Sequence, residues 1–109
     1  MTYSRRIILK KIDILMLEHP RIPLSAVSRS IGVERHTIEK AVRASRQMSF
    51  REYRRSKLSR KAQKLLEGST LTVGEIGVRL GYNTISSFSR FLQRSTGKSP
   101  SQYRRELPG

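Results

Sequence analysis

The stretch that decides the fold runs from Thr72 to Arg105 and reads TVGEIGVRLGYNTISSFSRFLQRSTGKSPSQYRR. Its first part carries apolar residues at the i, i+3, i+7 spacing of one helix face: Val73, Ile76 and Leu80. Thr72 and Glu75 have the spacing of a capping box, which predicts where this helix begins. Gly81 can adopt the left-handed conformation that ends it.

A second helix is predicted directly after this glycine, with Asn83 or Thr84 as its cap. Its apolar face consists of Phe88, Phe91 and Leu92. Its other face is polar and basic and carries Thr84, Ser86, Ser87, Ser89, Arg90, Gln93 and Arg94. A helix, a short glycine turn and a helix with a basic outer face form the helix-turn-helix pattern, whose second helix enters the major groove of DNA.

The same stretch resembles the C-terminal signature of the AraC/XylS family of transcription regulators. The resemblance rests on GEIGVRLGY at 74–82, followed by SSFSRFLQRSTGKSPSQYR at 86–104. Gly-Tyr, Phe-Ser-Arg-Phe, Gly-Lys-Ser-Pro and Tyr-Arg all stand at the family's spacing. The resemblance covers about residues 5–106 and implies an all-α fold of about seven helices, with two helix-turn-helix subdomains joined by a long linker helix.

Charge and composition indicate the class of partner. The 109 residues include 23 Lys and Arg against 8 Asp and Glu, a net charge of +15. This excess favours nucleic acid over an anionic membrane, because the basic residues are spread over several predicted helices. The chain has no cysteine, so disulfides, thiol catalysis and cysteine-bound zinc are excluded, and two distant histidines give a metal site no support. No apolar run approaches the ~20 residues of a membrane span, and the N-terminus does not resemble a signal peptide, so a cytoplasmic, nucleoid-associated protein is expected.

The N-terminal half predicts the same arrangement again. A helix over about 5–19 begins after Ser4 as a possible cap and ends at Pro20. A second helix ends at Gly32, and a third runs over about 35–46. At a shift of 49 residues, one set of positions matches between the halves: Leu24, Val27, Ile31 and Gly32 with Val73, Ile76, Leu80 and Gly81. At a shift of 50 another set matches: Ile38, Val42, Phe50 and Tyr53 with Phe88, Leu92, Pro100 and Tyr103.

This internal repeat predicts two related helix-turn-helix lobes, and the change of shift predicts an insertion in the turn. The expected division is an N-terminal subdomain at 1–48, a linker helix at 49–68 and a C-terminal subdomain at 69–109. Capping boxes are expected at Ser49 with Glu52 and at Ser99 with Gln102. At 1.5 Å per residue the linker helix is about 26 Å long. That length is compatible with the roughly 34 Å between successive major-groove faces.

Base-reading residues are expected near the start of each second helix. In the N-terminal lobe they are Arg35, His36, Glu39 and Lys40, and in the C-terminal lobe Ile85, Ser86, Ser89 and Arg90. Arg90 can bind guanine O6 and N7 together, although a phosphate contact or an internal ion pair is the alternative. Ile85 can meet a thymine methyl group or be an ordinary exposed residue. Glu39 can accept from cytosine N4 or pair with Arg35 or Arg43.

Contacts with the DNA backbone are expected from five further basic residues: Arg43, Arg54, Lys57, Arg94 and Lys98. The N-terminal lobe departs from the family pattern at two positions. Val42 replaces the usual phenylalanine, and Gln47 stands where glycine is usual. The C-terminal contacts are therefore the better supported set.

The combined prediction is a sequence-specific double-stranded DNA-binding transcription regulator of AraC type that reads two adjacent major-groove segments. The resemblance to activators that consist of the DNA-binding domain alone implies a monomer on DNA, contact with RNA polymerase, no cofactor and no small-molecule effector within this chain. One alternative is the DNA-binding fragment of a longer effector-sensing regulator. Another is a nonspecific architectural nucleic-acid-binding protein, marked by salt dependence without sequence preference. An enzyme is not expected, since no carboxylate pair or nucleophile–base arrangement is present.

Overall fold

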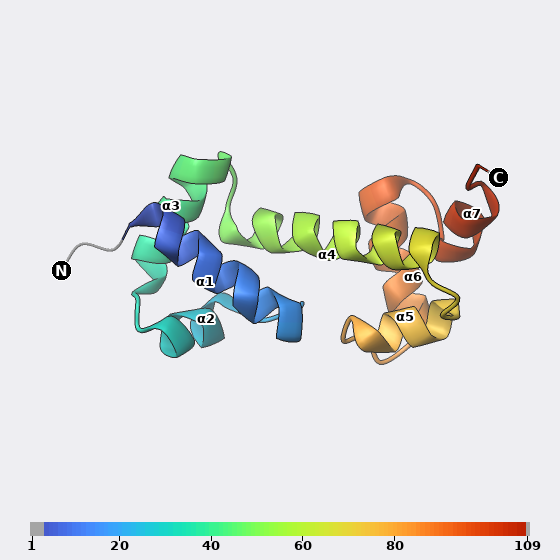
Figure 1. The fold of residues 1–109 in the computed structure, drawn as a ribbon, viewed down its shortest axis with the longest axis horizontal. Coiled ribbons are helices and arrows are strands. Elements are labelled where there is room, and N and C mark those ends of the chain that lie inside the picture. The colour runs from blue at the N-terminus through green and yellow to red at the C-terminus, as the bar shows by residue number, and fades with distance from the viewer. Residues whose placement is uncertain (1–3, 109) are drawn as a thin grey trace. The chain divides into compact units, whose positions relative to one another are not determined.

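The computed structural model describes residues 4–108, which form seven α-helices and, within that range, no strand. The helices, labelled in Figure 1, are α1 (Arg5–Glu18), α2 (Leu24–Ile31), α3 (Arg35–Arg46), α4 (Phe50–Gly68), α5 (Val73–Arg79), α6 (Ile85–Thr96) and α7 (Pro100–Arg105). The predicted all-α fold is confirmed, and a helix is present at each place where the sequence predicted one.

The chain divides into two compact units, which meet between Arg55 and Ser56 inside α4. The first turns of α4 belong to the core of the N-terminal unit, through Phe50 and Tyr53. The remainder of α4 belongs to the core of the C-terminal unit. The linker helix therefore contributes apolar residues to both cores. The boundaries expected from the sequence, 1–48, 49–68 and 69–109, stay a prediction.

In the N-terminal unit, α1 lies against α2 and α3 and covers the apolar faces of both helices (Figure 1). The most deeply buried residues of this core include Ile12, Val27, Ile38 and Val42, each 0% exposed. Val27 comes from the first helix of the helix-turn-helix pair, and Ile38 and Val42 come from the second. The periodicity that predicted these helices is thus the periodicity of burial.

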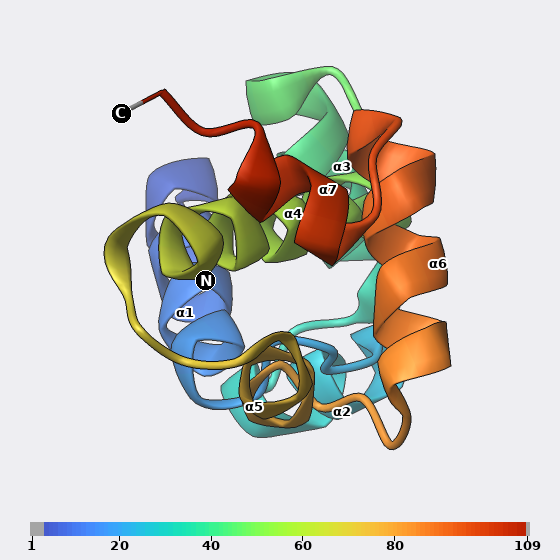
Figure 2. The ribbon, with the colours of Figure 1, turned by 90° about the vertical axis from the view of Figure 1, so that its right-hand side faces the viewer.

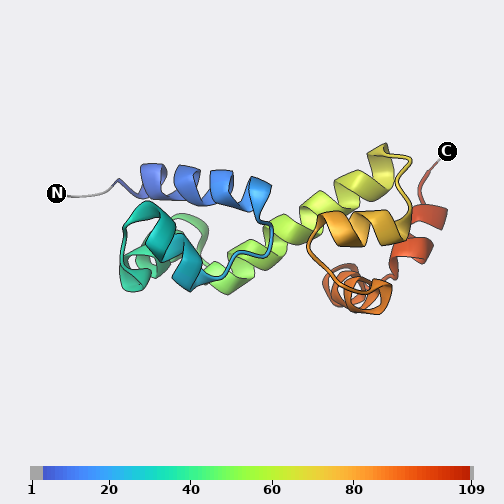
Figure 3. The same cartoon turned by 90° about the horizontal axis from the view of Figure 1, so that it is seen from below.

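In the C-terminal unit, α5 and α6 cross steeply: α5 is seen end-on in Figure 2, whereas α6 is seen end-on in Figure 3. Their shared core includes Ile76, Leu80, Phe88 and Leu92, each 0% exposed. A steep crossing joined by a short glycine-containing turn is the geometry of a helix-turn-helix pair.

The predicted caps are present at most helix starts. Ser49 and Glu52 exchange both bonds of a capping box at 3.1 Å, and Thr72 and Glu75 do so at 3.0 and 3.1 Å. Because these backbone N–H groups hold the ionised carboxylates, the pKa values of Glu52 and Glu75 lie below the usual glutamate range. The prediction for Ser4 is wrong: its side chain makes no capping bond, and its backbone carbonyl alone accepts from Ile8 N–H.

The internal repeat extends further than the sequence comparison reached. Three buried residues of α1 match three buried residues of α4 at a shift of 50: Ile8, Ile12 and Met16 with Leu58, Ala62 and Leu66. The second half of α4 therefore covers α5 and α6 as α1 covers α2 and α3. Each unit is a complete three-helix core, closed by the first turns of the helix that follows.

Tyrosine and arginine side chains repeat as well. The hydroxyl of Tyr53 donates to Asp13 Oδ1 at 2.6 Å. The hydroxyl of Tyr103 lies 3.2 Å from Oε1 of Gln63, the equivalent of Asp13, and 2.6 Å from Oε1 of Glu67. Burial, followed by the bond to Asp13, raises the pKa of Tyr53. The guanidinium of Arg54 donates to Ile22 O at 3.0 Å, and its equivalent in α7 donates to Leu71 O at 2.6 Å. The first bond ties the connector between α1 and α2 to α4. The second ties the connector between α4 and α5 to α7.

Candidate nucleic-acid interface

The turn of each helix-turn-helix pair is held by an equivalent backbone bond. In the N-terminal unit Val33 N–H donates to Ser28 O at 3.3 Å, and in the C-terminal unit Tyr82 N–H donates to Gly77 O at 2.9 Å. Gly32, with φ of 68°, and Gly81, with φ of 94°, supply the left-handed residue before these donors. The second turn is longer by one residue, as the change of shift predicted.

Close contact between α5 and α6 depends on a residue without a side chain. A Cβ atom at Gly77 would lie 3.3 Å from Phe88 Cβ, which is tighter than most carbon–carbon contacts in proteins. Tyr82 is buried beside this contact, and its ring centroid lies 5.7 Å from those of Phe88 and Phe91. Gly77 and the aromatic residues therefore fix how α6 is presented by the C-terminal unit.

The start of α6 presents three of its four predicted base-reading residues to solvent. Ile85 is 58% exposed, Ser86 and Arg90 are also exposed, and Ser89 is half-buried. Thr84 caps this end by accepting from Ser87 N–H at 3.1 Å. A capped and exposed helix start with a cationic side chain in its second turn is suited to the edge of a base pair.

The start of α3 has the same arrangement at a shift of 50. Arg35, His36 and Lys40 are exposed, whereas Glu39 is half-buried. Unlike Thr84, the residue before α3, Glu34, makes no side-chain capping bond. The structure thus gathers the predicted base-reading residues of each unit on one exposed helix start, at equivalent positions.

Glu39 has a structural partner that the sequence did not reveal. Its Oε2 accepts a hydrogen bond from Phe50 N–H, the first residue of α4, at 3.2 Å. The equivalent pair in the C-terminal unit is Ser89 and Pro100, and proline has no N–H to donate. The first residue of a helix has an N–H group without a partner inside the helix. Glu39 accepts from this N–H in the N-terminal unit, and Pro100 removes it in the C-terminal unit.

Two of the five predicted backbone-contacting residues are exposed, and the other three are half-buried. Arg43 and Arg94 are exposed, and Lys57 is half-buried. Arg54 is half-buried, bonds to Ile22 O and lies 5.8 Å from the ring centroid of Phe50. Lys98 forms an ion pair with Glu106 at 2.9 Å, which lowers the pKa of that carboxyl group. Arg54 and Lys98 therefore have partners within their own units.

Two exposed arginines beside the turns were not among the predicted contacts. Arg29 lies in the last turn of α2, and Arg79 lies in the last turn of α5. Their position just before each turn was visible in the sequence as a basic residue ahead of the glycine. Within residues 4–108 no helix is long and apolar enough to cross a membrane, and no group of three potential metal-ligating side chains is present.

Comparison with known proteins connects this geometry to a family. A family model described as a helix-turn-helix domain matches residues 27–106. The Msm operon regulatory protein of Streptococcus mutans serotype c is 30% identical over 81 residues, which make up 74% of this chain and 29% of that protein. The chain therefore spans less than a third of the length of this relative.

Solved structures agree on the fold. The C-terminal domain of AraT, a response regulator from Geobacillus stearothermophilus, is 27% identical with a TM-score of 0.76, over 94% of this chain and 81% of that one. The DNA-binding domain of AdpA, a global transcriptional factor whose structure contains a target DNA, is 21% identical with a TM-score of 0.77. That likeness covers 90% of this chain and 89% of that one, and it shows the shared fold.

Proposed function

Because this chain belongs to the AraC-type family of helix-turn-helix DNA-binding domains, we propose that it is a transcription regulator whose α3 and α6 read double-stranded DNA. The observation that carries this proposal is the repeated register of the two exposed helix starts. Arg35, His36 and Lys40 of α3 occupy the same positions as Ile85, Ser86 and Arg90 of α6. Two equivalent reading elements on one chain are suited to two adjacent major-groove segments.

Each reading helix has one leading residue in this proposal. Arg90 binds a guanine through O6 and N7, and Lys40 makes the corresponding contact from α3. Ile85 contacts a thymine methyl group, while Arg35, His36, Ser86 and Ser89 make the surrounding polar contacts. Glu39 keeps its bond to Phe50, which leaves Lys40 as the main charged group of the second turn of α3.

Phosphate contacts come from four exposed arginines and one half-buried lysine: Arg43, Arg94, Arg29, Arg79 and Lys57. The net charge of +15 supports such contacts, because each neutralised phosphate releases condensed counterions. Arg54 and Lys98 are left out of this group, since each is engaged inside its own unit.

The comparisons support a regulatory role beyond DNA binding. The relative from Streptococcus mutans is an operon regulatory protein, and the AdpA domain was crystallised on a target DNA. By analogy we propose that this chain binds an asymmetric site as a monomer and activates transcription through contact with RNA polymerase. The relative's greater length leaves room for a sensor outside the segment that this chain matches.

Binding to matched duplexes tests the proposal. A site is first selected from random duplexes in excess nonspecific competitor, and affinities for that site and for a scrambled duplex are then measured over a range of salt concentrations. We expect Arg90→Ala to weaken binding to the selected site by about 1–3 kcal/mol and to relax preference at one base pair. An equal loss on both duplexes would make Arg90 a backbone contact, and no enriched site would favour the architectural alternative.

A further inference from the structure

Helix α1 has a second apolar face whose side chains stay at least half exposed in the part of the chain that the structure describes. Ile7 is 50% exposed, Ile14 is 53% exposed and Leu17 is 69% exposed. Their i, i+7, i+10 spacing places them on one side of the helix, opposite the buried Ile8, Ile12 and Met16. We call these three exposed residues the α1 stripe. A soluble helix normally keeps one apolar face, so the α1 stripe is unusual.

The internal repeat provides a control for this observation. At a shift of 50, the residues equivalent to Ile7, Ile14 and Leu17 are Lys57, Lys64 and Glu67 of α4. The same three-helix core therefore forms with charged side chains at all three positions. The core of the C-terminal unit thus forms without aliphatic residues at these positions, although Glu67 there accepts a hydrogen bond from Tyr103.

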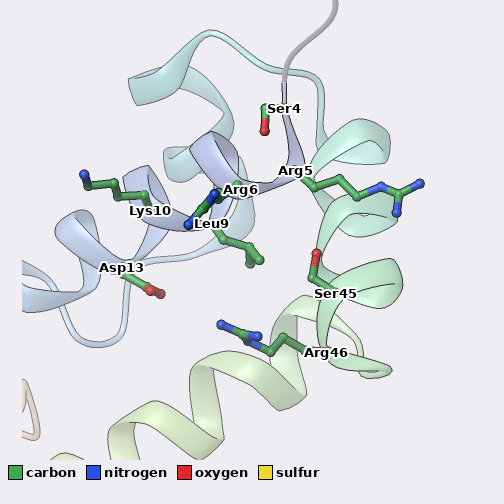
Figure 4. A pocket seen from close by; sticks show the side chains of 8 residues that line it. All are labelled: Ser4, Arg5, Arg6, Leu9, Lys10, Asp13, Ser45 and Arg46. Carbon is green, nitrogen blue, oxygen red and sulfur yellow. The ribbon is translucent and has the colours of Figure 1, made fainter.

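Basic side chains lie along the stripe and at its N-terminal end. Lys10 and Lys11 are exposed between Ile7 and Ile14. At the N-terminal end of α1, a pocket is lined by four cationic side chains, namely Arg5, Arg6, Lys10 and Arg46 (Figure 4). Its one carboxylate, on Asp13, accepts a hydrogen bond from Tyr53. The surface around the N-terminal part of the stripe is therefore positive, whereas the exposed carboxylate of Glu18 lies beside Leu17 at the other end.

We propose that the α1 stripe and its basic rim are a docking site for an acidic amphipathic helix of a partner protein. Apolar residues of that helix cover Ile7, Ile14 and Leu17, and its carboxylates pair with Lys10, Lys11 and the cations of the pocket. A second copy of this chain is disfavoured, because it would bring a like-charged rim against this one. The stripe faces away from the side of α1 that packs on α3, so docking does not compete with base reading.

The test uses a designed 21-residue helical peptide with leucine at its a and d positions and glutamate at its e and g positions. A matched peptide carries lysine in place of glutamate. The protein variant Ile7→Lys/Ile14→Lys/Leu17→Glu transplants the residues of α4 onto α1, and circular dichroism and thermal unfolding check its folding. Ile14→Ser alone serves if the triple variant unfolds. Binding is measured by fluorescence anisotropy at fixed salt.

We expect the acidic peptide to bind the wild-type protein and to bind the triple variant at least tenfold more weakly. The triple variant is more positive by one charge, since two lysines and one glutamate are added, so attraction by charge alone predicts equal or tighter binding. Lys10→Ala/Lys11→Ala should also weaken binding of the acidic peptide. Affinity of all variants for the selected DNA site should be unchanged, which separates this inference from the proposed function.

Several results would overturn the docking site. They are no binding of the acidic peptide, equal binding by wild type and triple variant, or equal binding of the lysine peptide. A wild-type dimer in sedimentation that is lost in the triple variant would assign the stripe to a second copy. Binding to vesicles containing phosphatidylglycerol that requires the stripe, without peptide binding, would assign it to a membrane surface.

Discussion

The carboxylate of Glu39, in the second turn of α3, accepts a hydrogen bond from Phe50 N–H, the first residue of α4, with 3.2 Å between Oε2 and N. The bond ties the reading helix of the N-terminal unit to the helix that follows it. Glu39 and Lys40 are neighbours near the start of α3. Lys40 is exposed, whereas Glu39 is half-buried and bonds to the backbone of α4. A carboxylate among the predicted base-reading residues thus has a structural explanation.

Removing this carboxylate should cost stability. We expect Glu39→Ala to lower the free energy of unfolding by about 1–3 kcal/mol, because it leaves the Phe50 N–H without its acceptor. Ser89→Ala is the matched control, since Pro100 has no N–H to satisfy. Urea unfolding measures both. If Glu39→Ala instead keeps full stability and relaxes preference at one base pair, Glu39 is a base-reading residue after all.

Gln47 ends α3 in a left-handed conformation, with φ of 54°, where Gly97 ends α6 with φ of 82°. Within residues 4–108 it is the one residue other than glycine with a positive φ. Because a side chain in this conformation costs roughly 1–2 kcal/mol, we expect Gln47→Gly to stabilise the protein by about 1 kcal/mol. Gly97→Ala should destabilise it. Thermal unfolding of both variants and the wild type measures these effects. A melting temperature of Gln47→Gly below that of the wild type would contradict the expected relief of strain.

Arg54 and Arg104 hold equivalent connectors in the two units. Arg104 donates to four carbonyl groups, those of Leu66, Leu71, Leu65 and Ser69. We expect Arg54→Ala and Arg104→Ala each to lower the free energy of unfolding by about 1–3 kcal/mol, since partly buried carbonyl groups lose charged donors. The exposed neighbour Arg55→Ala should leave stability unchanged. Should Arg54→Ala keep stability and lower the salt dependence of DNA binding by about one phosphate contact, Arg54 belongs to the backbone-contacting group.

Acid should weaken the capping boxes. The pKa values of Glu52 and Glu75 are lowered chiefly by backbone bonds to Ser49 and Thr72, so each carboxylate stabilises the fold fully above its unfolded pKa. That stabilisation is lost as pH falls from about 5 through the folded pKa. The difference in melting temperature between wild type and Glu75→Gln should therefore be largest at pH 7 and shrink as the pH falls below about 4. A difference that stays constant as the pH falls would show that the carboxylate's charge is not the cause.

Local signals made most of the fold predictable from the sequence. Apolar spacing located most helices, the cap at Ser99 located α7, and the capping boxes at Ser49 and Thr72 involve residues only three positions apart. The bond from Phe50 to Glu39 crosses eleven positions and depends on how α3 meets α4, so spacing alone could not reveal it. Arg54 was expected to contact the DNA backbone because of its charge, whereas its bond to Ile22 O crosses 32 positions and could not be seen in the sequence.

Two further features of the structure could not be predicted from the spacing and types of residues in a helix. α1 has apolar residues on both faces, and the sequence pattern identified the buried face without showing that Ile14 and Leu17 stay exposed. Ser4 has the residue type of a cap, but its hydroxyl makes no capping bond. The exposed starts of α3 and α6 lie where the sequence placed them, whereas their contacts with bases stay predictions.

Footprinting on a selected site tests the central claim most directly. Fragments bound from a sheared genome in excess competitor are aligned, and the shared site is probed with hydroxyl radicals using wild type, Lys40→Ala and Arg90→Ala. We predict protection over about two helical turns, with each variant losing base preference in a different half of the site. Protection over a single turn, or bound fragments that share no motif, would contradict a protein that reads DNA with two helices.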